Sequence, residues 1–98
     1  MARPKKDRCI ACNPQADYFK PRAIPLVDLE EVSLSLDELE AVRLADYEGR
    51  YHEEAAREMK ISRPTFGRII GEARRKIAEA LLLGKALRIE KNKETDGG

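Results

Sequence analysis

The chain has 98 residues, of which 38% are charged and 42% hydrophobic, and its formal net charge is +1. A chain of this length has room for one hydrophobic core, which excludes a large two-domain enzyme. It contains no run of 18 apolar residues, so we predict no membrane-spanning helix. No apolar run follows the basic start, so we also predict no secretory signal. We therefore expect a cytoplasmic protein that has no membrane partner.

The small net charge is the sum of large charge blocks of opposite sign. Residues 1–22 sum to +4, residues 23–59 to −8 and residues 60–93 to +7, while the last five residues add −2. Such segregation is typical of proteins that bind a polyanion. Helical proteins also segregate charge without any such function. The order of the charges nevertheless makes nucleic acid a candidate partner.

Residues 1–33 are predicted to be a basic extended arm and connector. Four prolines lie too close together in this segment for any long helix. Tyr18 and Phe19 are its large aromatic side chains, and we expect them to attach the arm to the body. The alternation of apolar and polar residues from Val32 to Leu36 predicts a short strand.

Residues 34–90 are predicted to fold as three helices. Ser35 and Glu38 form a capping-box pattern at the start of the first helix, which Gly49 ends. The second helix covers residues 51–60, and acidic residues in its first turn suit the helix dipole. The third begins at Arg63, after the capping residue Ser62, and ends before Gly84.

The third helix has an apolar face and a polar face. At about 100° per residue, one stripe holds its apolar side chains, and Arg68, Glu72, Arg75 and Glu79 lie opposite. The members of the apolar stripe are Phe66, Ile69, Ile70, Ala73, Ile77, Ala80 and Leu81. Residues 86–90 alternate and predict a terminal strand that pairs with the one near Val32, and residues 91–98 read as a disordered tail. The expected fold is mainly α, a three-helix helix-turn-helix domain with an extended N-terminal arm and a small two-stranded β element.

The second and third helices match the steric demands of a helix-turn-helix. Ala56 supplies a small residue where the two helices cross, and apolar residues surround it: Ala55, Met59, Ile61, Phe66 and Ile69. Lys60 stands where glycine commonly adopts a left-handed conformation, which costs another residue roughly 1 kcal/mol. The alternative is a plain three-helix bundle with a solvated basic face, stabilised by the pairs Glu72–Lys76 and Arg75–Glu79.

The third helix supplies candidate DNA-binding residues. Arg63, Thr65 and Arg68 are candidates for base contacts at its start. Gly67 and Gly71 would let its backbone approach a groove wall, or alternatively cross the first helix closely. Candidates for phosphate contacts are Lys60, Arg74, Arg75 and Lys76, and the arm residues Arg3, Lys5, Lys6 and Arg8 are candidates for the DNA backbone or a minor groove.

Residues 3–90 resemble a bacterial and archaeal domain-of-unknown-function family of small predicted DNA-binding proteins. The resemblance rests on motifs that include Cys12-Asn13-Pro14, Tyr18-Phe19-Lys20-Pro21, Glu53-Glu54-Ala55-Ala56, Thr65-Phe66-Gly67-Arg68 and Gly84-Lys85-Ala86-Leu87-Arg88-Ile89. It implies a helix-turn-helix similar to the fourth conserved region of sigma factors, which reads promoter DNA. His52 and Lys60 depart from the Gln and Gly expected there. The resemblance implies a fold and a binding class but no pathway.

Cys9 and Cys12 form a CxxC pair in the arm. They make half a zinc site, and His52 is the one further soft or borderline donor. Two arms of a homodimer could form a four-cysteine zinc site, a redox sensor is a further alternative, and two reduced thiols are the plainest reading. We therefore predict no cofactor and leave zinc open. The sequence holds no clustered acid–base pair, P-loop or dinucleotide-binding turn, which favours a non-enzyme.

These patterns favour a sequence-specific regulator of transcription that binds double-stranded DNA as a homodimer. Two alternatives stay open. The first is a protein-interaction module that binds RNA polymerase through the acidic surface of residues 28–58. The second is a CxxC sensor of thiols or metal.

Overall fold

The computed structural model describes residues 10, 11 and 13–90. It is mainly helical and has a small sheet at one end. Its elements are β1 (Tyr18–Phe19), the 3-10 turn η1 (Leu26–Asp28), β2 (Glu31–Leu34), α1 (Leu36–Val42), the π-helical turn η2 (Arg43–Tyr47), α2 (His52–Met59), α3 (Arg63–Leu83) and β3 (Ala86–Ile89). The predictions for Arg3, Lys5, Lys6, Arg8, Cys9, Cys12 and the tail 91–98 lie outside the described residues.

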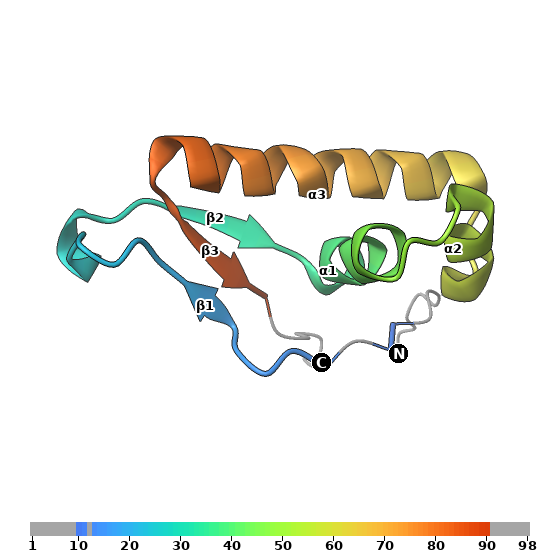
Figure 1. Cartoon of the computed structure of the whole chain (residues 1–98), viewed down its shortest axis with the longest axis horizontal. Coiled ribbons are helices and arrows are strands. Elements are labelled where there is room, and N and C mark those ends of the chain that lie inside the picture. The colour runs from blue at the N-terminus through green and yellow to red at the C-terminus, as the bar shows by residue number, and fades with distance from the viewer. Residues whose placement is uncertain (1–9, 12, 91–98) are drawn as a thin grey trace, which may run out of the picture.

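The long helix α3 runs the length of the molecule, with the sheet beneath one end and α1 and α2 beneath the other (Figure 1). The sheet has three strands in the order β1-β3-β2. The predicted pairing of the Val32 strand with the terminal strand is confirmed, and it is parallel, with Val32 opposite Leu87. A parallel pair needs a long crossover, and the three helices provide it.

The prediction of a two-stranded β element was wrong by one strand. β1 pairs antiparallel with β3, Tyr18 lying opposite Arg88 and Phe19 opposite Leu87. A two-residue strand between prolines is too short for alternation to reveal it. The backbone of these two residues therefore attaches the segment to the body through the sheet, whereas the predicted attachment by both aromatic side chains was wrong for Phe19, which is 54% exposed.

The helix ends follow local chemistry. The capping box of α1 is present, because Glu38 N–H donates to Ser35 Oγ at 3.1 Å and Ser35 N–H donates to Glu38 Oε1 at 2.9 Å. The α-helical hydrogen bonds stop at Val42, before the predicted end of this helix, and one π turn follows. In that turn Glu48 N–H donates to the Arg43 carbonyl at 2.9 Å.

A three-residue turn joins α2 to α3. Lys60 has φ 61° and ψ 42°, the left-handed conformation predicted for it. Its conformation reverses the chain so that Ile61 N–H donates to the Ala56 carbonyl at 3.0 Å. Ser62 then caps α3, accepting from Thr65 N–H at 3.2 Å. Local residues therefore set the angle between these two helices.

Replacing Lys60 with glycine is expected to raise the free energy of unfolding by about 1 kcal/mol, because glycine adopts the left-handed conformation without a Cβ penalty. Urea unfolding followed by circular dichroism measures the change. Lys60→Ala is the matched control, since it removes the charge and keeps the Cβ. If Lys60→Ala stabilised the fold as much as Lys60→Gly, the gain would come from removing the Lys60 charge, and the prediction would be contradicted.

The core lies under the start of α3. Its buried residues come from four elements around the α2–α3 turn: Ala41, Leu44, Ala55, Ala56, Met59, Phe66 and Ile70. Farther along α3, Ala73 and Ala80 are buried. The prediction that Leu81 belongs to the buried stripe was wrong, because it is 77% exposed. At this end the sheet lies along one side of α3, and successive helical residues point about 100° apart.

Within the described residues, no helix is long and apolar enough to cross a membrane.

Candidate nucleic-acid interface

Four exposed cations surround the turn between α2 and α3: Arg57, Lys60, Arg63 and Arg68, here called the basic cluster. Arg57 and Lys60 belong to the end of α2, and Arg63 and Arg68 to the first two turns of α3. Seven other cations of the described residues form ion pairs with carboxylates: Arg43, Arg50, Arg74, Arg75, Lys76, Lys85 and Arg88. No member of the basic cluster has an ion pair within the described part of the chain. Its positive charge is therefore available to an external anion.

Two of the three predicted base-contacting residues, Thr65 and Arg68, are linked to each other. Ser62 Oγ lies 2.9 Å from Thr65 Oγ1, and Arg68 Nη2 donates to Thr65 Oγ1 at 3.3 Å. Thr65 thus holds the Arg68 guanidinium beside the first turn of α3. The structure brings Arg63, Thr65 and Arg68 to one end of one helix.

Gly67 and Gly71 lie on open surface. A Cβ built on either glycine has no neighbouring heavy atom within 4 Å. The alternative that these glycines permit a close crossing against the first helix was therefore wrong. What remains is a strip of α3 backbone without side chains, next to Arg68.

The predicted phosphate contacts farther along α3 already have partners. Arg74 pairs with Asp46 of the π turn at 2.7 Å, and this hydrogen bond raises the pKa of Arg74. Lys76 Nζ lies 2.9 Å from Glu38 Oε1 and joins α3 to the start of α1. Using these cations on a phosphate would weaken contacts within the fold.

Arg75 lies between Glu72 and Glu79, at 2.8 Å and 3.1 Å. The expected Arg75–Glu79 pair is confirmed. The expected Glu72–Lys76 pair was wrong, because Glu72 pairs with Arg75 and Lys76 reaches Glu38. The hydrogen bond from Arg75 lowers the pKa of Glu72. Arg75 is therefore less available to an external phosphate than its exposed position suggests.

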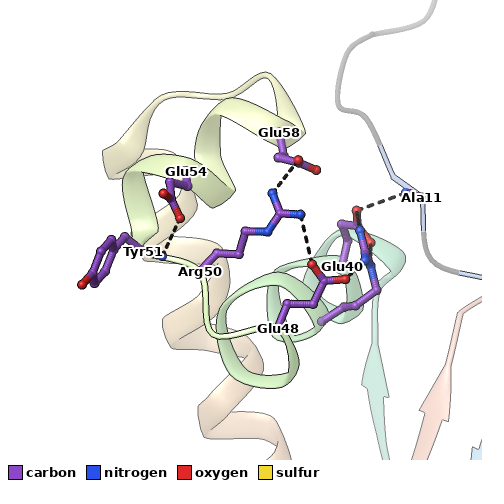
Figure 2. A network of polar contacts seen from close by, with 8 residues as sticks. Ala11, Glu40, Glu48, Arg50, Tyr51, Glu54 and Glu58 are labelled. Atoms are coloured by element: carbon purple, nitrogen blue, oxygen red, sulfur yellow. Dashed lines mark hydrogen bonds and ion pairs between the residues drawn. The ribbon is translucent and has the colours of Figure 1, made fainter.

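The acidic middle of the chain is organised by two arginines. Arg43 pairs with Glu40 and Glu48, and Arg50 lies between Glu48 and Glu58 (Figure 2). Glu40, 2% exposed, also accepts from the backbone N–H of Ala11 at 3.1 Å. This contact holds the backbone of Ala11, an inner residue of the CxxC motif, against α1.

Two shallow depressions border the basic cluster. One, of about 610 Å³, is lined by Arg50, Glu54, Arg57, Glu58 and Lys60. Its three cations face two carboxylates, and Arg50 already pairs with Glu58. The second, of about 430 Å³, is lined by Ala45, Arg50, Tyr51, His52, Glu53, Arg63 and Arg74. Of these arginines, Arg50 and Arg74 already pair with carboxylates of the fold, so neither depression is by itself a strongly positive site.

Sequence reasoning missed Arg57, Tyr51 and His52 at this surface. Arg57 was detectable, because it stands one helical turn before Lys60 on a helix of known phase. His52 packs edge-on against Phe66, with ring centroids 5.1 Å apart.

Within the described residues no group of three or more His, Cys, Asp or Glu side chains could hold a metal ion.

Comparisons with known proteins give a family match. Residues 1–95 match the family described as "Protein of unknown function DUF134". The chain is 56% identical over 90 residues to a UPF0251 protein of Halothermothrix orenii, and 58% identical over 90 residues to one of Caldanaerobacter subterraneus. These alignments cover 92% of this chain and 67% and 76% of those relatives.

A UPF0251 protein of Desulfosudis oleivorans is 54% identical over 90 residues, and the chain spans 65% of its length. None of these three names states an activity. No solved structure matches the chain.

Proposed function

We propose that this chain, which belongs to the DUF134 family of uncharacterised proteins, binds double-stranded DNA in a sequence-specific manner and regulates transcription. The observation that carries the proposal is the basic cluster around the α2–α3 turn, where four exposed cations have no ion pair in the described structure. Duplex DNA presents one phosphate charge per about 1.7 Å of its axis, and cations that neutralise phosphates release counterions.

The arrangement of α2 and α3 supports binding in the major groove. A left-handed residue and a capping serine join the two helices within three residues, as in a helix-turn-helix. In that motif the start of the second helix enters the major groove. Here that start is α3, and its first turns expose Arg63, Arg68 and the open backbone at Gly67.

We rank the candidate DNA contacts by whether each cation would have to break an ion pair within the fold. Arg57, Lys60 and Arg63 can approach phosphates without leaving a carboxylate of the described fold, so we place them ahead of Arg74, Arg75 and Lys76. Arg68 is the candidate for base recognition, since a bidentate arginine–guanine contact is the commonest specific one. Thr65 would hold the Arg68 guanidinium in position before DNA binds.

The test begins with selection of a preferred sequence from a random duplex pool. Arg68→Ala is expected to weaken binding to that sequence about 10-fold to 100-fold while leaving a scrambled duplex nearly unchanged, because a good bidentate contact is worth about 1–3 kcal/mol of discrimination. Arg57→Ala is expected to weaken both duplexes alike and to reduce the slope of log K against log salt by about 0.9, the loss of one phosphate contact.

Fluorescence anisotropy over a range of salt concentrations measures both effects. Arg88→Ala is the matched control, since Arg88 lies on the sheet and pairs with Glu31. Equal losses for all three variants, or no preferred sequence, would contradict the proposal.

RNA polymerase, the other candidate partner, would use the acidic surface of residues 28–58. Arginines of this chain already pair with three carboxylates of that segment, Asp46, Glu48 and Glu58. Less negative charge is therefore available to a basic partner. We therefore favour DNA. Binding to a polymerase subunit without any binding to duplex DNA would reverse this preference.

A further inference from the structure

The end of the molecule farthest from the basic cluster exposes five large aliphatic side chains, here called the apolar end: Leu26, Val27, Leu81, Leu82 and Leu83. Each is at least 66% exposed. The loop that contains η1 and the last turn of α3 lie at the same end of the fold, opposite α2 (Figure 1). Leu81, Leu82 and Leu83 are consecutive in a helix and therefore point in different directions, so the sheet on one side of α3 cannot bury all of them.

The apolar end is held in place by contacts of its own. Gly84 ends α3 in a left-handed conformation, and a Cβ there would lie 3.8 Å from the Ile24 side chain. Lys85 Nζ lies 2.7 Å from Glu79 and 3.3 Å from Glu30, which joins the end of α3 to the segment before β2. The aliphatic side chains are thus displayed on an ordered surface.

The charges near the end of α3 are paired with one another, whereas Asp28 of η1 is exposed and has no ion pair within the described residues. Lys85 is shared between Glu79 and Glu30, and Glu79 also pairs with Arg75. A strongly charged partner would find little complementary charge here.

We propose that the apolar end is the interface through which two copies of this chain associate. A two-fold interface places the same patch on both sides, and a mainly apolar patch is complementary to itself. This proposal stands apart from DNA binding, because the interface lies at the far end of α3. That helix has 21 residues and is therefore about 31 Å long.

The exposed aliphatic area sets an upper bound on the size of such an interface. A fully buried aliphatic side chain removes about 100 Å² of apolar surface from water, since about 2.5 kcal/mol corresponds to that area at 25 cal/mol/Å². At the observed exposures, burial of all five side chains would supply at most about 400 Å² per copy by the same scale. If about 65% of a homodimer interface is apolar, the total surface buried on the two copies together is about 1,200 Å². This is the lower limit of specific, stable interfaces.

Sedimentation of the full chain without DNA, across a wide range of concentrations, tests the proposal. Wild type is expected to form a dimer, and Leu82→Glu to raise the dimer dissociation constant at least tenfold, because a carboxylate would be buried without a partner. Tyr47→Glu is the matched control, since Tyr47 is equally exposed but lies in the π turn. Thermal melting followed by circular dichroism verifies that both variants fold.

Reducing agent and a chelator are included in a parallel series. If these reagents dissociate the dimer and Leu82→Glu does not, the association depends on Cys9 and Cys12. That result would overturn the proposal. A wild-type chain that stays monomeric would also overturn it. Because DNA is absent from these measurements, a monomer that still binds duplex DNA would reject the interface and leave the proposed function intact.

Discussion

Replacing Phe66 with alanine is expected to lower the free energy of unfolding by about 3–5 kcal/mol, the usual cost of truncating a buried aromatic side chain. Phe66 is fully buried in the first turn of α3. It belongs to the core cluster with Leu44 and Met59, so it joins the π turn, α2 and α3. Domains of this size are stable by about 5–15 kcal/mol, so the variant should lose a large fraction of its stability and unfold at a lower urea concentration.

Urea unfolding with circular dichroism measures this loss. Tyr47→Ala is the control, because Tyr47 is 86% exposed and its truncation should change stability by about 0.5 kcal/mol or less. A loss below about 1 kcal/mol for Phe66→Ala would mean that the helices do not share one core, contrary to the observed packing.

Replacing Gly67 with leucine should have the opposite pattern, with loss of DNA binding and retention of the fold. The position is open, and leucine is a better helix former than glycine by up to about 1 kcal/mol, so the melting temperature should not fall. In the proposed complex, however, the α3 backbone at Gly67 lies against the groove wall, and four additional carbon atoms would separate the two surfaces. We expect affinity to fall at least 100-fold.

Ala78→Leu provides the matched control for this experiment. Ala78 is exposed and lies about three turns along α3 on nearly the same face, beyond the proposed groove contact. Anisotropy with the selected duplex should give an unchanged affinity for Ala78→Leu. Unchanged affinity for Gly67→Leu would reject the groove role of this glycine.

Features set by neighbouring residues were predictable from sequence. The capping pairs of Ser35 and Ser62, the left-handed Lys60 and the stop at Gly84 depend on residues within a few positions of one another. These signals located the three helices and the surface at the start of α3.

Features set by distant residues were not predictable in this way. The Arg74–Asp46 and Lys76–Glu38 pairs join positions 28 and 38 residues apart. Helical periodicity places Arg74 and Lys76 on a face of α3 but gives no information on which carboxylate lies there. The exposure of Leu81 depends likewise on how far the sheet extends along α3. The short strand β1 exists because β3 offers a free edge.

The order of the sheet also bears on how the chain folds. β3 is its central strand and follows both of its neighbours in sequence: Glu31 pairs with Ala86, and Tyr18 with Arg88. No hairpin between adjacent strands can therefore nucleate the sheet. Closing such long loops costs entropy before any strand contact forms, whereas the helices gain local contacts early. On the ribosome, α1, α2 and α3 can assemble around Phe66 while β1 and β2 still lack a partner. We therefore expect the sheet to be the last part of this fold to form, and a chain that stops before residue 86 to keep its helical core and lose the sheet.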